Sequence, residues 1–111
     1  MIPLPDRGSL VWVHFSPQAG SEQAGRRPAI VLTTESYHRV SRLAIVCPIT
    51  NRERGWPTEV KLPPGLPVGG VILVDHVKSI DRDARYMEVV GQAPVEILDE
   101  IDARLAPLLS L

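Results

Sequence analysis

The chain has 111 residues, of which 44% are hydrophobic and 23% are charged, and its formal net charge at pH 7 is −1. This length fits one domain spanning residues 1–111, and the composition excludes a disordered chain. No stretch approaches the roughly 20 apolar residues of a membrane-spanning helix, so no membrane association is expected. Cys47 is the only cysteine, which excludes an internal disulfide, and the first residues lack the features of a signal peptide. Both observations predict a cytoplasmic protein.

The small net charge conceals an uneven distribution of charged residues. Residues 20–58 hold six arginines and three glutamates, whereas the chain from Glu96 onward holds four acidic residues and one arginine. Because the planar guanidinium forms paired hydrogen bonds with phosphate or carboxylate groups, the arginine-rich segment predicts an anionic partner. An ordinary solvated surface is the alternative explanation.

Short blocks of β-branched, aromatic and other apolar residues, separated by glycine and proline, predict β-strands. In chain order these blocks are residues 9–15, 29–33, 43–50, 58–62, 71–80 as one long or bulged strand, and 85–90. Pro48 cannot donate a backbone hydrogen bond, so a bulge or an edge position is expected near the end of the third strand. Two polar loops, residues 16–26 and 51–57, follow the first and third strands.

The apolar spacing becomes helical near the C-terminus. Pro94 suits the first helical position, and Pro107 is expected to kink or end the helix. The apolar stripe of this helix consists of Ile97, Leu98, Ile101, Leu105 and Leu108. Five or six short strands with one such helix predict a mainly β fold with minor α content, either a small β-barrel or a strongly bent sheet capped by the helix. Side chains fill the interior of small barrels, so function is expected in the two polar loops.

The first polar loop contains a candidate phosphate site. Glu22, Arg26 and Arg27 lie within six residues, next to Gly20 and Gly25, so the guanidinium groups could donate to phosphate oxygens while the carboxylate accepts a proton. Thr50, at the end of the third predicted strand, has a hydroxyl that could donate to the same oxygens. The alternatives are a solvated loop with a weak ion pair and, for Thr50, an ordinary strand residue.

The histidines and tryptophans suggest further hypotheses. His14 and His76 could form an acid/base pair acting on RNA, but no pattern predicts that they lie close together. A zinc site formed by the three histidines and Cys47 fails because these residues lack the spacing of structural zinc ligands. Trp12 alternates with valines and is expected in the core. Trp56, in the second polar loop, is a candidate for stacking on a base, with shielding of one end of the barrel as the alternative.

Four segments carry a resemblance to a known family. They are residues 8–17, the Gly-Ser-Glu-Gln-Ala-Gly-x-Arg-Pro segment at 20–28, Cys47-Pro48-Ile49-Thr50, and Asp75-His76-Val77-Lys78-Ser79-Ile80. Together they resemble the MazF/PemK (Kid) family of type II toxin endoribonucleases, the mRNA interferases. The resemblance extends from about Asp6 to the C-terminal helix, and the second segment is its most specific part.

The resemblance implies a small SH3-like barrel that forms a homodimer, with single-stranded RNA lying in a groove along the dimer interface. It also implies cleavage of RNA at short sequence motifs without a metal or another cofactor. Arg27 and Thr50 match the catalytic pair of the family, and the loop carboxylate of Glu22 is a further contributor. The implied RNA-binding residues are His14, Ser16, Ser21, Gln23, Arg26, Asn51, Trp56, His76 and Lys78. The implied protein partner is an antitoxin whose acidic, disordered C-terminal tail covers the basic groove.

Metal-free cleavage is simplest when the 2′-hydroxyl of the RNA attacks the adjacent phosphorus and leaves a 2′,3′-cyclic phosphate and a 5′-hydroxyl. In that reaction Arg27 and Thr50 would stabilise charge on the phosphoryl oxygens, and Glu22 or water would remove the proton, because an arginine is a poor base. Two other functions compete: a CcdB-like toxin, which binds DNA gyrase through the same type of barrel, and an RNA-binding protein without nuclease activity. The Glu-Gln-Ala-Gly-x-Arg-Pro segment, which CcdB toxins lack, argues against the first, and the presence of Glu22, Arg27 and Thr50 together argues against the second.

Overall fold

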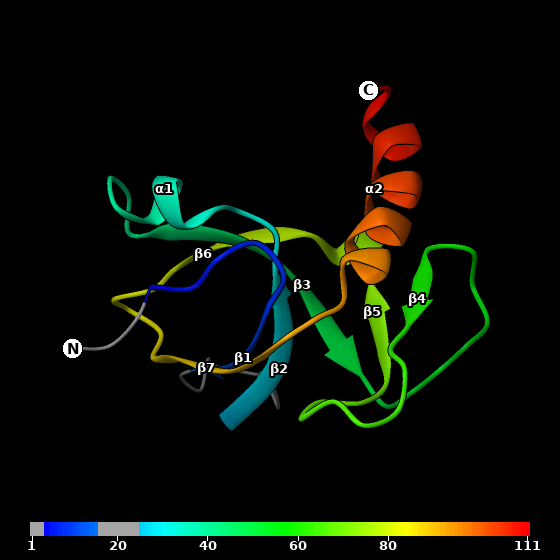
Figure 1. Ribbon diagram of the computed structural model, residues 1–111, viewed down its shortest axis with the longest axis horizontal. Helices are drawn as coiled ribbons and strands as arrows, with labels where there is room; N and C mark the ends of the chain where they lie inside the picture. Colours follow the sequence, from blue (N-terminus) through cyan, green and yellow to red (C-terminus); the bar gives the residue numbers. More distant parts are fainter. Residues whose placement is uncertain (1–3, 16–24) are drawn as a thin grey trace, which may run out of the picture.

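A computed structural model describes residues 4–15 and 25–111 of the chain. Within these residues, seven strands form one antiparallel sheet, accompanied by two helices and a short 3-10 helix (Figure 1). The elements in chain order are β1 (Ser9–Phe15), β2 (Gly25–Val31), α1 (Glu35–His38), β3 (Leu43–Thr50), β4 (Glu59–Lys61), β5 (Val71–Leu73), η1 (Val74–His76), β6 (Lys78–Asp81), β7 (Met87–Gln92) and α2 (Val95–Leu109).

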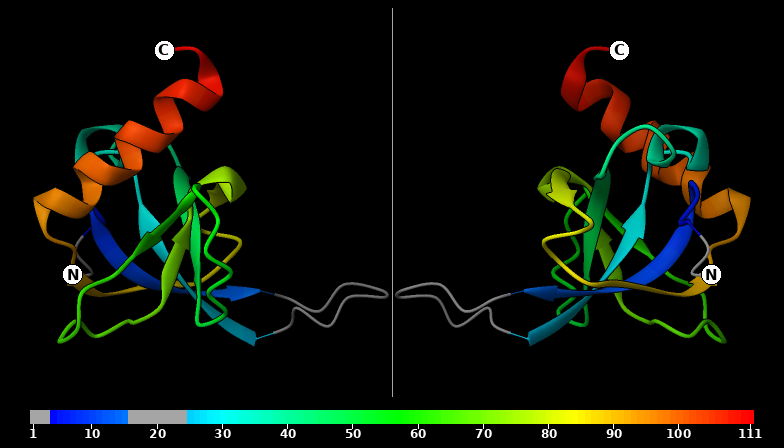
Figure 2. Two further views of the ribbon diagram at one scale, coloured as in Figure 1. Left: turned by 90° about the vertical axis from the view of Figure 1, so that its right-hand side faces the viewer. Right: turned by 90° about the vertical axis from the view of Figure 1, so that its left-hand side faces the viewer.

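The strand β3 organises the sheet because it changes partners along its length. Its first half, Leu43 to Val46, pairs with β6, residues 46–48 pair with β2, and Ile49 and Thr50 pair with β5. The sheet continues from β5 to β4 on one side and from β2 through β1 to β7 on the other. The two branches diverge in space, so the sheet is strongly bent (Figure 2). The predicted mainly β fold with a C-terminal helix is therefore confirmed.

The alternation of side chains along β1, β2 and β3 divides the buried residues between two hydrophobic clusters. Leu10, Ile30 and Cys47 belong to the first cluster, which also receives Ile97, Leu98 and Ile101 from α2. The second cluster lies on the other face of the same strands and consists of Val11, Val13, Ala29, Val31, Ala44, Val46 and Ile80. Both faces of the central strands are thus buried, which explains their continuous apolar runs.

Several predicted boundaries are wrong. β2 begins at Gly25, four residues before the predicted start, so Arg26 lies in the strand rather than in the preceding loop. The expected strand over residues 71–80 is divided by η1 into β5 and β6. Pro48 pairs with Ala29 of β2 on one side and lies between the β6 and β5 ladders on the other, so it has the predicted edge position without a bulge in the β2–β3 ladder. The short helix α1 was not predicted at all.

The helix α2 also differs in detail from the sequence prediction. Pro94 is its N-cap rather than its first helical residue, and the helix continues past Pro107 to Leu109 before Ser110 adopts a left-handed conformation with φ 57°. One turn from the end, the missing N–H of a proline removes a single helical hydrogen bond, so the helix tolerates it. Leu108, at the end of the predicted stripe, is half-exposed.

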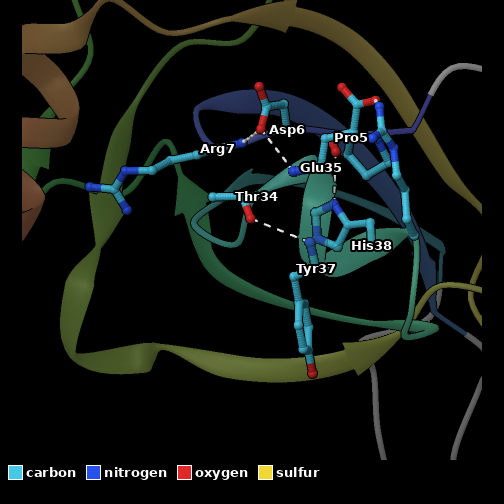
Figure 3. Close-up of polar contacts among 8 residues, drawn as sticks. Pro5, Asp6, Arg7, Thr34, Glu35, Tyr37 and His38 are labelled. Carbon is cyan, nitrogen blue, oxygen red and sulfur yellow. Dashed lines mark hydrogen bonds and ion pairs between the residues drawn. The ribbon is translucent and has the colours of Figure 1, made fainter.

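Residues 5–7 are bound to α1 and the start of the sheet through polar contacts (Figure 3). The carboxylate of Asp6 accepts hydrogen bonds from the backbone N–H groups of Arg7 at 2.8 Å and Glu35 at 2.9 Å. His38 is buried, with Nδ1 2.7 Å from the carbonyl oxygen of Pro5 and Nε2 2.7 Å from the hydroxyl of Thr33. Both ring nitrogens of His38 are therefore engaged in contacts that stabilise the fold and do not act as metal ligands.

We expect Asp6→Asn to destabilise the protein in a pH-dependent manner. The backbone N–H groups of Glu35 and Arg7 lower the pKa of Asp6 below its ordinary value of 3.8. A carboxylate with a lowered pKa stabilises the fold above its ordinary pKa, and that contribution disappears as the pH falls through the lowered value. The melting temperature of the variant should lie about 2 °C below that of the parent at pH 7 and approach it below pH 4. Asp83→Asn, on an exposed turn, controls for the lost charge, and a pH-independent difference would contradict the prediction.

Candidate active site

The structure brings Arg27 and Thr50 to neighbouring strands. The β2–β3 ladder ends at the pair Ala29–Pro48, and two residues further along the strands Arg27 pairs with Val13 of β1 and Thr50 with Val71 of β5. The alternation of side chains places Arg27 on the same face as Ala29 and Thr50 on the same face as Pro48. Arg27 and Thr50 line one cleft of about 270 Å³, which we call the central cleft. Its wall consists of Val13, Arg27, Pro28, Ala29, Val46, Pro48, Ile49, Thr50, Leu73, His76 and Lys78.

Two further clefts adjoin the central cleft at Thr50. The Trp12 cleft, beside β1 and β2, is lined by Trp12, Arg26, Arg27, Pro28, Ile49, Thr50, Asn51, Arg52 and Gly69. The Trp56 cleft, beside β5 and the segment after β3, is lined by Thr50, Arg52, Arg54, Trp56, Glu59, Leu73, Asp75 and His76. Thr50 lines all three clefts, which together form what we call the groove. Four arginines face this groove, so it is suited to a chain of phosphates.

The backbone around Thr50 fixes the position of its hydroxyl. The N–H of Arg52 donates a hydrogen bond to Thr50 Oγ1 at 3.2 Å, which leaves the hydroxyl hydrogen available to donate to a ligand. Gly70 passes directly against the other side of this segment: its φ is +114°, and a Cβ there would overlap the Thr50 carbonyl oxygen. Thr50 is therefore held by a neighbouring segment of the same chain, in which position 70 has room only for glycine.

Arg26 and Trp12 form a stacked pair in the Trp12 cleft. The guanidinium carbon of Arg26 lies 4.8 Å from the centre of the Trp12 ring, and its Nη2 lies 3.4 Å from the carboxylate of Glu88. Trp12 packs against the first hydrophobic cluster, as predicted, but it also lines the groove. In this arrangement the indole ring and the guanidinium plane offer a stacking surface to a ligand. The sequence predicted only a core position for Trp12.

The segment after β3 presents Trp56 to solvent. Trp56 is 51% exposed, and the guanidinium carbon of Arg54 lies 5.7 Å from its ring centre. About half of the residue is exposed, so its side chain is accessible to a ligand, and stacking on a base stays a prediction. Asn51, also predicted as an RNA-binding residue, lines the neighbouring Trp12 cleft.

The two histidines of the proposed acid/base pair have different surroundings. His14, on β1, contacts the ring of Tyr86 edge-on with centroids 5.2 Å apart. His76 lines the central and Trp56 clefts, with Nε2 4.0 Å from the Asp75 carboxylate. In the part of the chain that the structure describes, no contact joins His14 to His76. Asp75 was missed by the sequence argument, although a carboxylate directly beside a candidate histidine was a usable signal.

Several predicted residues lie outside the described residues: Ser16, Ser21, Glu22 and Gln23. Among residues 4–15 and 25–111, no three His, Cys, Asp or Glu side chains gather in a way that would hold a metal ion. Cys47 is buried, and burial raises the pKa of its thiol to about 12, so it is neither a ligand nor a nucleophile at neutral pH. No helix within these ranges is long and apolar enough to cross a membrane.

The comparison with known protein families decides the classification. The family model for PemK-like, MazF-like toxins of type II toxin-antitoxin systems matches residues 6–109. The chain belongs to this family. The endoribonuclease toxin MazF of Escherichia coli K12 is 42% identical over 106 residues, which cover 96% of this chain and 95% of that relative. The endoribonuclease PemK of E. coli is 32% identical over 110 residues, covering 95% and 82% of the two chains.

Solved structures of MazF proteins have the same fold as this MazF-family chain. A crystal structure of MazE–MazF from Deinococcus radiodurans matches with a TM-score of 0.89 and 46% identity over 96% of this chain and 97% of that one. A crystal structure of MazF from the same organism matches with a TM-score of 0.86 and 48% identity, with the same coverage. Membership in the MazF family decides against the CcdB-like alternative.

Proposed function

We propose that this MazF-family chain is the toxin of a type II toxin-antitoxin system and cleaves single-stranded RNA at specific sequences without a metal ion. The observation that carries the proposal is the meeting of Arg27 and Thr50 in the central cleft, at the junction of clefts lined by arginines. The relative named endoribonuclease toxin MazF, 42% identical over nearly the whole chain, supports the same reaction. Residues 1–111 would act as one domain in the cytoplasm.

The reaction follows from the chemistry of RNA. The 2′-oxygen attacks the adjacent phosphorus, the bond from phosphorus to the 5′-oxygen breaks, and the leaving oxygen takes up a proton from Arg27 or from water. The products are a 2′,3′-cyclic phosphate and a 5′-hydroxyl. Arg27 stabilises the charge that develops on the phosphoryl oxygens, and Thr50 donates its free hydroxyl hydrogen to the same oxygens. Glu22 or a water molecule removes the 2′-proton.

The groove supplies the binding energy and the sequence selectivity of the proposed reaction. Arg26, Arg52 and Lys78 would pair with phosphates on either side of the cleaved bond. Trp56 would stack on a base, with Asn51 and His76 as hydrogen-bonding partners. Ser16, Ser21, Gln23 and His14 complete the set of RNA-binding residues that we propose.

The remaining partners follow from the shape and charge of the groove. A domain of this size offers an open groove rather than a deep pocket, so we propose that a second copy of the chain completes the site in a homodimer. A MazE-like antitoxin with an acidic C-terminal tail would occupy the groove by pairing with its arginines. The MazE–MazF structures from Deinococcus radiodurans support such a partner.

The proposal is tested by incubating the purified protein with a long single-stranded RNA in excess EDTA and mapping the new ends. We expect cleavage at a restricted set of sequences, with 2′,3′-cyclic phosphate and 5′-hydroxyl ends. A DNA strand of the same sequence should bind and remain intact, because it lacks the attacking hydroxyl. Cleavage that disappears in EDTA would contradict the metal-free reaction, and an intact RNA would contradict the proposed function.

A further inference from the structure

Glu59 holds the segment between β3 and β4 through its carboxylate. One oxygen accepts hydrogen bonds from the N–H groups of Arg54 at 3.1 Å and Gly55 at 2.9 Å, and the other oxygen lies 3.2 Å from the same Arg54 nitrogen. The N–H of Glu59 in turn donates to the carbonyl oxygen of Trp56 at 3.0 Å. A single side chain and its own backbone thus fix three consecutive residues, two of which line the Trp56 cleft.

The position of Glu59 connects this segment to the rest of the sheet. Glu59 is the first residue of β4, and its partner in the ladder is Leu73 of β5. Leu73 lines both the central cleft and the Trp56 cleft. The pairing of β4 with β5 therefore fixes the backbone of Glu59. Through its hydrogen bonds, the Glu59 carboxylate in turn fixes the exposed segment between β3 and β4, which carries arginines.

The charge of Glu59 is unfavourable for the ligand that the groove would bind. A carboxylate that lines a cleft repels phosphate, so a side chain selected for its charge would be neutral or basic here. Both oxygens of Glu59 are instead directed at backbone N–H groups, where a charged acceptor forms stronger hydrogen bonds than a neutral one. The gain from ordering the segment must therefore exceed the cost of the repulsion.

We propose that Glu59 is a positioning residue that holds Arg54 and Trp56 in the shape that binds RNA, and so sets the affinity for substrate rather than the rate of bond cleavage. Glu59 touches neither Arg27 nor Thr50 in the contacts described above, and it acts through the segment that it orders. This inference rests on the proposed function, since it assumes that RNA occupies the Trp56 cleft.

The decisive experiment compares Glu59→Gln with the parent in steady-state RNA cleavage. Loss of a negative charge alone would lower KM, because phosphate repulsion falls. Loss of positioning would raise KM, and we expect a rise of about tenfold with kcat changed less than twofold, since ground-state and transition-state binding are weakened equally. Glu53→Gln is the matched control: Glu53 belongs to the same segment, pairs with Lys61, 3.6 Å away, and is not among the residues lining the Trp56 cleft. Its KM should stay level or fall.

A second variant and a second measurement separate positioning from charge and from misfolding. Glu59→Asp keeps the charge but shortens the side chain, so it should also raise KM. Amide hydrogen exchange at Gly55 should be faster in both Glu59 variants than in Glu53→Gln, while their melting temperatures remain close to that of the parent. An unchanged or lowered KM in Glu59→Gln, or unchanged exchange at Gly55, would overturn the inference. A parent protein that cleaves no RNA would instead overturn the proposed function.

Discussion

Arg27→Ala is expected to lower the rate of RNA cleavage by about 10³-fold without unfolding the protein. A single donor to a developing oxyanion contributes about 10² to 10³ in rate, and a guanidinium that neutralises a phosphoryl group contributes more. Arg27 is exposed at the start of β2 and belongs to neither hydrophobic cluster, so the fold does not depend on its side chain. Single-turnover cleavage measured beside a melting curve tests both parts of the statement.

Arg42→Ala is the matched control for Arg27. Arg42 is an exposed arginine that pairs with Asp81 at 3.4 Å and is not among the residues lining the groove. Arg42→Ala therefore changes the net charge by the same amount as Arg27→Ala. Cleavage by this variant should stay within twofold of the parent. Residual activity of Arg27→Ala above a tenth of the parent rate would show that another group stabilises the transition state.

Gly70→Ala is expected to affect both stability and cleavage. Its φ of +114° is strained for any residue with a side chain, and the added methyl group would overlap the carbonyl group of Thr50. We expect a loss of about 2 kcal/mol in the free energy of unfolding, in the range of strained backbone positions. Cleavage should fall by about 10²-fold, because a displacement of about 1 Å in a catalytic group has an effect of that size. Urea unfolding and single-turnover cleavage measure the two effects.

The neighbouring glycine provides the control for this prediction. A Cβ at Gly69 would meet no atom within 4 Å, and the backbone there is not left-handed. Gly69→Ala should therefore retain nearly the stability of the parent, and because Gly69 lines the Trp12 cleft, any change in cleavage should appear in KM and not in the single-turnover rate at saturating RNA. If Gly70→Ala retained full cleavage, Thr50 would tolerate the displacement, and its assigned role as a positioned donor would be wrong.

Local patterns predicted the parts of the structure that depend on local physics. β3 runs over residues 43–50 as predicted, because a continuous apolar run matches a strand buried on both faces. The stripe of Ile97, Leu98 and Ile101 matches the buried face of α2, because helical spacing determines which residues face the sheet. The family, and with it the fold, followed from the specific segment at 20–28. The catalytic pair stays a prediction, supported by its place in the central cleft.

Long-range contacts explain what the sequence argument missed. α1 is too short to form alone and depends on Asp6, which is distant in sequence and binds the N–H of Glu35. β2 begins at Gly25 because His14 and Phe15 extend the β1 ladder to Arg26 and Gly25, against the low strand propensity of that segment. Asp75 is the exception, because it lies directly beside His76 in the sequence and a local signal for it was therefore present.

The change of partners along β3 separates the residues proposed to select RNA from those proposed to cleave it. Thr50 ends the strand where the β2 branch and the β5 branch part, and the three clefts that meet there draw their walls from different stretches of the chain. Arg26 and Trp56 line different clefts, so a substitution at either residue alters one wall and leaves the other walls in place. If RNA binds and is cleaved there as proposed, its sequence selectivity can change in steps while the arrangement of Arg27 and Thr50 stays constant.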